Sequence, residues 1–291
     1  FFVKKGWEFV IVSSGAIAAG KSKLGLKELP KTIPYQQAAA AAGQSHLMWA
    51  YEKSFKRNGL KVAQVLLTHE DLGHRHRYIN ARNTLQILLE NSVVPIVNEN
   101  DTVSVEEIKF GDNDILSAFA ADLVKAHLLI ILTDIDGFFT ADPRRIKDAT
   151  LIPLVKDITS SLEAMAEKSS TRLGTGGMKT KLEAARKVAL SGVPTVIANG
   201  RERDIIKRLL RGEELGTLFL PGVTKLKGKK PWIAQHRRPR GYIIIDGGAR
   251  NALVNNGKSL LPSGITRVEG EFQAGDLVAC LDGEGVEIAR G

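Results

Sequence analysis

Two clusters of carboxylates and amides lie close together in the stretch VNENDTVSVEEIKFGDND, residues 97–114. The first cluster, residues 98–101, follows an apolar run that is typical of a buried strand, and the second, residues 111–114, begins a helical pattern. Capping and an Asx turn offer a structural explanation, although capping requires only one Asp or Asn at a helix start. Carboxylates bind ammonium groups and amides bind carboxylates, so the other explanation is a site for a zwitterion.

The stretch RLGTGGMKTKLEAARK, residues 172–187, places glycines, threonines and lysines directly before a helical pattern. A Walker phosphate-binding loop requires a glycine, four residues and then Gly-Lys-Ser/Thr. Counting from Gly174, Lys179 stands where the second glycine is required, and the dinucleotide fingerprint fails at the same place. The residues alone leave two interpretations: a phosphate cradle of another kind, or a glycine-rich connection whose lysines face solvent.

Polar residues also end two further apolar runs. In VSSGAIAAG, Ser13, Ser14 and Gly15 lie where a strand is expected to turn into a helix. Free backbone N–H groups at such a turn favour an anion or a carboxylate, and a serine N-cap is the structural alternative. In LTDIDGFFTADPR, residues 132–144, two aspartates could hold a metal, a ribose or a base, or could serve an ordinary turn.

Other kinds of catalytic site are not indicated. The six histidines form no HxxxH or HExxH pair and no Cys/His cluster, which argues against a zinc site. The serines lack the Gly-x-Ser-x-Gly pattern of a hydrolase elbow. Phosphoryl transfer depends on positioning and cations rather than on a covalent nucleophile, and polar strand ends with nearby lysines fit that requirement.

Alternating strand and helix patterns must position these groups. Continuous Val/Ile/Leu runs predict strands covered on both faces, as in parallel sheets, and several of the helical patterns between them end with Gly or Asn. We therefore predict an α/β fold with a doubly wound, mostly parallel sheet sandwiched by helices, whose ligands bind beyond the carboxyl ends of the strands. The predicted strands are residues 9–14, 62–68, 93–101, 128–134 and 193–200, and the predicted helices are residues 45–59, 81–91, 113–126 and 181–192.

The character of the sequence changes after about residue 222. Short β-type runs separated by Gly, Pro and Asn predict a small β-rich module there. Residues 224–240 contain seven Lys and Arg and no Asp or Glu, so they carry +7 of the net charge of +9. Either a solvated linker or contact with a polyanion would explain this local basicity.

Composition is that of an ordinary globular protein, because 43% of the residues are hydrophobic and 25% are charged. No apolar run approaches the ~20 residues of a membrane span, and the first residues lack the pattern of a signal peptide. The single cysteine, Cys280, excludes an internal disulfide framework and fits a reducing compartment. We therefore expect a cytoplasmic protein without a membrane partner.

Seven stretches, taken in order, are VSSGAIAAG, GQSHLMWAYE, QVLLTHEDL, YINARNTL, VVPIVNENDTVSVEEIKFGDNDILSA, LTDIDGFFTADPR and GTGGMKTKLEAA. Together they resemble the glutamate 5-kinase family of the amino acid kinase superfamily, across nearly all of residues 1–222. The tail resembles the PUA domain that many of these kinases carry. The resemblance divides the chain into an amino acid kinase domain (1–222), a basic linker (223–230) and a PUA-like domain (231–291).

This resemblance implies transfer of the ATP γ-phosphate to the side-chain carboxylate of L-glutamate, giving γ-glutamyl phosphate and ADP, the first step of proline biosynthesis. It implies that Lys181 neutralises the transferring phosphoryl group and that Asp114 orients the catalytic lysines. Mg²⁺ is expected with the nucleotide. The implied glutamate contacts are Ser14, Asp101 and Asn113. The implied nucleotide contacts are Thr133, Asp134, Thr175, Gly176, Gly177, Met178, Lys179, Thr180 and Lys181, with Lys179 at a variable position of the motif.

The chain departs from the family pattern at both ends. The family begins with a strand bearing a lysine and a Gly-Ser turn, whereas Phe1 falls in the tail of the helix that should follow. The PUA segment would normally continue past the final ARG. We therefore expect a fragment that does not catalyse the reaction on its own. The family also implies feedback inhibition by proline and assembly into dimers or tetramers.

Two alternatives stay open. Within the superfamily, the acceptor could be N-acetylglutamate, aspartate or a nucleoside monophosphate, although the paired NEND and GDND clusters argue against these. From another class, the chain could be an RNA-binding protein with a vestigial kinase fold, which the basic stretch and the PUA resemblance would support.

Overall fold

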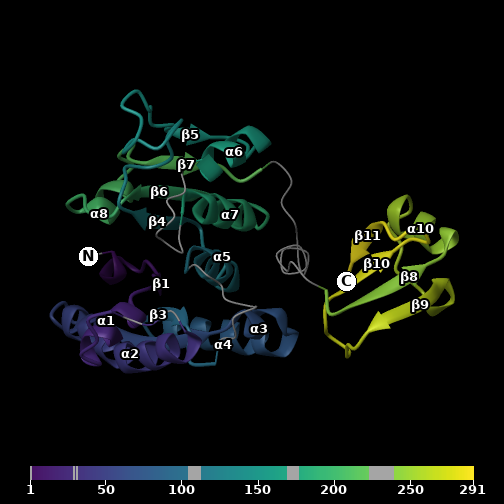
Figure 1. Cartoon of the computed structure of the whole chain (residues 1–291), viewed down its shortest axis with the longest axis horizontal. Helices are drawn as coiled ribbons and strands as arrows, with labels where there is room; N and C mark the ends of the chain where they lie inside the picture. The colour runs from purple at the N-terminus through teal and green to yellow at the C-terminus, as the bar shows by residue number, and fades with distance from the viewer. Residues whose placement is uncertain (1, 29, 31, 104–112, 169–176, 223–238) are drawn as a thin grey trace. The chain divides into compact units, whose positions relative to one another are not determined.

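The computed structural model describes residues 2–28, 30, 32–103, 113–168, 177–222 and 239–291. The chain divides into two compact units (Figure 1). The first comprises Phe1–Leu72 and Asn80–Lys225, and the second comprises Gly73–Ile79 and Leu226–Gly291. Among the described residues, no helix combines the length and apolar character needed to cross a lipid bilayer.

A three-stranded parallel sheet in the first unit has the strand order β1-β3-β2. Its central strand is buried over five consecutive residues, 94–98, as expected for a strand covered on both faces. The strands are β1 (Ile11–Val12), β2 (Lys61–Leu67) and β3 (Val93–Glu99). The helices along this part of the chain are η1 (Val3–Lys5), α1 (Ala16–Lys23), α2 (Ile33–Lys56), α3 (His69–Gly73) and α4 (Arg75–Glu90).

Helices α1 and α2 pack closely against each other at Gly43. A Cβ atom on Gly43 would lie 1.9 Å from the backbone oxygen of Ala16, and backbone cannot move aside as a flexible side chain could. This contact between the helices matters for function. α1 follows directly from β1, and α2 places side chains at the same end of the three-stranded sheet.

A four-stranded mixed sheet, also in the first unit, has the order β4-β6-β7-β5. β4 pairs with β6 and β5 with β7 in parallel, whereas β6 and β7 are antiparallel. The apolar face of α7 and the edge-to-face ring pair Phe138–Phe219, 6.1 Å between centroids, belong to its core. The strands are β4 (Leu129–Thr133), β5 (Leu154–Val155), β6 (Thr195–Asn199) and β7 (Thr217–Phe219), and the helices are α5 (Asn113–Leu123), α6 (Ser160–Lys168), α7 (Met178–Ala189) and α8 (Ile205–Leu209).

The predicted elements exist, but several of their bounds were wrong. β1 is shorter than predicted, because its register with β3 covers only Ile11 and Val12. α2 begins at Ile33 rather than at residue 45, since the run QQAAAAA consists of strong helix formers and Pro34 suits a first turn. The strands predicted for one sheet lie in two sheets among the described residues.

The second unit contains a four-stranded sheet of order β11-β10-β8-β9, which confirms the β-rich module predicted from the turn residues. Its β8 and β10 are parallel, and the two outer pairings are antiparallel. Asp246 caps α10 by accepting a hydrogen bond from the Ala249 N–H at 2.7 Å. The strands are β8 (Gly241–Ile245), β9 (Ile265–Gly270), β10 (Val278–Leu281) and β11 (Glu287–Arg290), with α10 (Gly247–Val254) and η3 (Pro262–Gly264).

Candidate active site

A cavity of about 1310 Å³ in the first unit follows the edges of two strands. Consecutive residues 9–12 line one side and residues 128–132 line the other. Because successive side chains of a strand point to opposite faces, a run of consecutive lining residues means that the cavity follows a strand edge. β1 and β4 each stand at the end of their sheet, and within the described residues no strand pairs with either of these edges.

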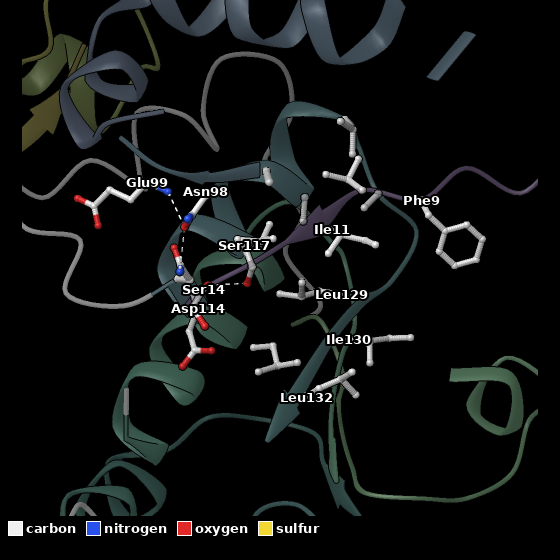
Figure 2. A pocket seen from close by; sticks show the side chains of 18 of the residues that line it. Phe9, Ile11, Ser14, Asn98, Glu99, Asp114, Ser117, Leu129, Ile130 and Leu132 are labelled. Carbon is white, nitrogen blue, oxygen red and sulfur yellow. Dashed lines mark hydrogen bonds between the residues drawn. The ribbon is translucent and has the colours of Figure 1, made fainter. Parts of the chain in front are cut away.

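One end of this cavity is polar. Figure 2 shows Ser14, Asn98, Glu99 and Asp114 gathered at that end, away from Phe9, Ile130 and the other apolar side chains. The polar residues come from the ends of β1 and β3 and from the start of α5. This agrees with the expectation that ligands bind beyond the carboxyl ends of strands. Lining residues at this end are Ser14, Asn98, Glu99, Asp101, Asn113, Asp114 and Lys181.

The central ion pair of this end joins Lys181 to Asp114. The Lys181 Nζ lies 2.7 Å from the Asp114 Oδ2, and the two side chains are 11% and 12% exposed. Asp114 is in the first turn of α5, where the helix dipole favours a carboxylate. Lys181 is in the first turn of α7, where the dipole disfavours a cation, so the carboxylate across the gap compensates it.

Thr180 adds a hydroxyl to the same carboxylate. Its Oγ1 lies 3.0 Å from the Asp114 Oδ2 and 2.7 Å from the Gly177 carbonyl oxygen. A hydroxyl has one proton, so it donates to one of these acceptors at a time. Asp114 therefore holds the lysine and is itself positioned by the turn that begins α7.

Three amide side chains form a chain of hydrogen bonds behind the ion pair. The Asn113 Nδ2 donates to the Ser13 carbonyl oxygen at 3.0 Å and to the Asn98 Oδ1 at 3.3 Å. The Asn98 Nδ2 donates to the Gln44 Oε1 at 2.9 Å. Asn98 is 2% exposed, so this chain belongs to the interior. The polar clusters of the sequence include Asn98 and Asn113 but not Gln44, because Gln44 lies 54 residues from Asn98 and no spacing rule connects them.

The turn after β1 is built by glycine rather than by a serine cap. Gly15 is the N-cap residue of α1, with φ of 103°, a conformation that favours glycine, and no side chain caps the helix. The structural alternative for this stretch, N-capping by a serine, is therefore wrong. Ser14 is exposed and lines the cavity, whereas Ser13 is buried and bonds the Tyr51 hydroxyl at 2.9 Å. Asp101, in the turn after β3, also lines the cavity.

Thr133 and Asp134 lie at the end of β4 and are not among the residues that line the cavity. The Asp134 carboxylate accepts from the Thr133 hydroxyl and from an Arg144 nitrogen, each at 3.4 Å, and it is about half exposed. Arg144 also bonds Asp142. Burial alone would raise the pKa of Asp142, but hydrogen bonds from Arg144 and the charges of Arg144 and Arg145 outweigh it and lower that pKa.

The segment predicted to cover the nucleotide phosphates is described only in part, because Thr175 and Gly176 lie outside the described residues. Gly177 is the N-cap residue of α7, and Met178 is buried in the apolar core. The exposed Lys179 Nζ lies 2.6 Å from the Glu167 Oε1 on α6. Within the described part of this segment, Thr180 and Lys181 contact Asp114.

Two families match the chain. Residues 1–199 match the amino acid kinase family and residues 241–291 match the PUA domain. The chain belongs to the amino acid kinase family, and the predicted family and α/β fold class are confirmed.

Its relatives narrow the comparison to one kind of amino acid kinase. The chain is 55% identical to the glutamate 5-kinase of Pelobacter propionicus over 288 residues, 99% of this chain and 77% of that protein. It is 56% identical to the glutamate 5-kinases of Geobacter sulfurreducens and Citrifermentans bemidjiense, over 98% and 99% of this chain and 77% of each relative.

Proposed function

We propose that this chain transfers the γ-phosphoryl group of ATP to the side-chain carboxylate of L-glutamate. The observation that carries the proposal is the Lys181–Asp114 pair at the polar end of the cavity, next to amides and carboxylates suited to a zwitterion. The similarity to glutamate 5-kinases supports the choice of substrate. The products are γ-glutamyl phosphate and ADP, and the reaction would open proline biosynthesis.

The chemistry explains why a cation is needed. A side-chain carboxylate oxygen of glutamate attacks the γ-phosphorus, the new O–P bond forms, and the bond to the β-phosphate oxygen breaks with its electrons leaving on ADP. Both reactants are anions, so positive charge and N–H donors must face the transferring group. In this proposal Lys181 supplies that charge, and Asp114 holds the ammonium in position. Ser14, Asp101 and Asn113 contact glutamate, which aligns the attacking oxygen.

The nucleotide side of the proposal involves Thr133, Asp134 and the segment 175–181. Among the described residues, no group of three His, Cys, Asp or Glu side chains is placed to hold a metal ion. In this proposal Mg²⁺ would come with the nucleotide and would neutralise phosphate charge. Thr180 and Asp114, hydrogen-bonded to each other at 3.0 Å, lie beside the Lys181 ammonium that this proposal places at the phosphoryl group.

The test measures phosphoryl transfer to four acceptors: L-glutamate, N-acetyl-L-glutamate, L-aspartate and UMP. We expect any transfer to favour L-glutamate, with ADP release matched by acyl phosphate trapped with hydroxylamine. Normal turnover from this chain would overturn the expectation, drawn from the family pattern, that it does not catalyse the reaction on its own. Calorimetric binding of L-glutamate gives a second readout that does not depend on turnover. Faster transfer to another acceptor, or no binding of L-glutamate, would contradict the proposal.

Lys181→Met should abolish most of the transfer, by about a hundredfold or more, because the charge facing the phosphoryl group is lost. Arg186→Met is the matched control, since Arg186 is on the same helix but pairs with Glu163 at the surface. Equal losses in the two variants would show that α7 needs its charges for folding rather than for transfer.

RNA binding through the basic stretch 224–240 and the residues 241–291 is a second candidate function, which the match to the PUA domain favours. We expect salt-dependent RNA binding that weakens when Arg237, Arg238 and Arg240 are neutralised. Absence of binding at low salt would remove this candidate.

The proposal also includes features that rest on the family resemblance. These are feedback inhibition by proline, assembly into a dimer or tetramer, and the division into residues 1–222, 223–230 and 231–291. A cytoplasmic location is supported by the single cysteine. Light scattering of the purified chain and a glutamate titration at several proline concentrations test the first two.

A further inference from the structure

We propose that Gln44, on α2, is a positioning residue: it holds the Asn98 amide, and through it the Asn113 amide, in the orientation that leaves the Asn113 oxygen for the glutamate ammonium. The inference rests on the proposed function, because it takes Asn113 as a glutamate contact. Gln44 does not line the cavity itself, so its effect would pass through Asn98.

The orientation of the three amides follows from backbone groups at two points. The Asn113 side chain faces the Ser13 carbonyl oxygen, which can only accept, so its nitrogen must point there. The Asn98 side chain accepts from the Glu99 backbone N–H at 2.9 Å, which can only donate, so its oxygen must point there. The Asn98 nitrogen then faces Gln44, whose oxygen must accept it. Neither asparagine can be flipped without losing a backbone bond, and a flipped Gln44 would place its nitrogen against the Asn98 nitrogen.

Two polar atoms are left over by this arrangement. Among the described residues, the buried Asn113 Oδ1 and the buried Gln44 Nε2 have no hydrogen-bond partner. A buried polar atom without a partner is costly, and such atoms in native structures point to a missing ligand or water. An acceptor on Asn113, at the polar end of the cavity, matches the N–H groups of an ammonium. Gln44 therefore helps to select substrates with a free α-amino group.

Ser13 and Tyr51 connect the Asn113 end of the network to the sheet and to α2. The Ser13 backbone N–H donates to the Val97 oxygen at 2.9 Å, which extends the β1–β3 pairing by one residue. The Ser13 side chain bonds the Tyr51 hydroxyl on α2, the helix that also carries Gln44. Through Ser13, the Asn113 end of the amide chain is thus attached to the sheet and to α2, and the Gln44 end lies on α2 itself.

The experiment measures dissociation constants by calorimetry for L-glutamate, for glutarate, which lacks the ammonium, and for ATP. In Gln44→Met we expect L-glutamate binding to weaken about fivefold or more, because the Asn98 nitrogen loses its acceptor. ATP binding should change less than twofold, and the preference for L-glutamate over glutarate should narrow. Gln44→Glu keeps an acceptor oxygen and should bind L-glutamate more tightly than Gln44→Met does.

The control is Gln86→Met, the same substitution at an exposed glutamine of α4 whose side chain bonds Glu90. It should leave all three constants unchanged. Unchanged L-glutamate binding in Gln44→Met would overturn the inference, and so would a parallel loss of L-glutamate and ATP binding, which indicates a general structural defect. Failure of the unsubstituted chain to bind L-glutamate would instead overturn the proposed function itself, before any substitution is compared.

Discussion

The first turn of α7 carries two lysine–carboxylate pairs of nearly equal length in opposite settings. The Lys181–Asp114 pair is 2.7 Å long between side chains that are 11% and 12% exposed. The Lys179–Glu167 pair is 2.6 Å long between side chains that are 62% and 58% exposed. The bond lengths therefore do not distinguish the pairs; the solvent around them does.

The difference in exposure indicates which of the two pairs the stability of the protein depends on. An exposed pair gains little, because water and salt screen both charges whether or not they meet. A largely buried pair has lost its water, so each member depends on the other, and removal of one leaves an uncompensated charge. The Lys181–Asp114 pair, called the inner pair, is thus stable as a pair and vulnerable to loss of either partner, which fits the role proposed for Lys181. The Lys179–Glu167 pair is called the outer pair.

The largest expected effect is that of Asp114→Ala on stability. This substitution leaves the Lys181 ammonium buried without its carboxylate, and we expect the free energy of unfolding of the first unit to fall by about 3 kcal/mol. Urea denaturation followed by tryptophan fluorescence measures the change. Glu167→Ala, its counterpart in the outer pair, should produce no measurable change.

The double variant Asp114→Ala, Lys181→Met sharpens this result. Because it removes both charges, it should be more stable than Asp114→Ala alone. A double variant less stable than Asp114→Ala would show that the unpaired charge does not cause the loss in the free energy of unfolding. Altered packing around α5 and α7 would then be the cause.

A smaller effect is expected for Thr180→Val, which keeps the shape of the side chain and removes its hydroxyl. The hydroxyl serves the inner pair, so we expect a loss of about 1 kcal/mol in the free energy of unfolding. Thr140→Val is a matched control in the first unit, because the Thr140 side chain is exposed, bonds Thr150 and is not among the residues that line the cavity. A larger loss in Thr140→Val would contradict the special position of the inner pair.

Sequence patterns could separate the two lysines in part. Met178, Leu182, Ala185 and Val188 form an apolar stripe along α7, and Lys181 falls within it whereas Lys179 does not. Helical periodicity thus indicates which lysine faces inward. The partner of Lys181 is 67 residues away; the polar cluster 111–114 marks Asp114 as a candidate, but only the family resemblance connects it with the lysine.

Local sequence patterns indicate some of the other residues of the site and give no sign of the rest. Local patterns place Ser14, Asp101 and Asn113 at the ends of predicted strands or the start of a helix, because such ends are marked by polar residues after apolar runs. They contain no information on Gln44, whose role depends on how α2 crosses the sheet. The separation of β1 and β4 into different sheets is equally invisible, since apolar runs predict strands but not their neighbours.

The smallest expected effect concerns the pH dependence of the outer pair. The hydrogen bond from Lys179, and then its charge, lower the pKa of Glu167 below its ordinary value of 4.5, against a slight opposing effect of burial. A carboxyl whose pKa is lower in the folded state stabilises the fold fully above its unfolded pKa. That contribution is lost as the pH falls below 4.5 and through the lowered pKa.

Carbon-detected NMR titration of the Glu167 carboxyl measures this directly. In Lys179→Met the titration midpoint should rise toward 4.5, because both the hydrogen bond and the charge are gone. High salt should shift the midpoint of the unsubstituted chain in the same direction, since an exposed pair is screened. A midpoint that neither the substitution nor salt moves would mean that Lys179 and Glu167 do not pair in solution. Lys179 would then be an exposed lysine that contrasts with Lys181 by exposure alone.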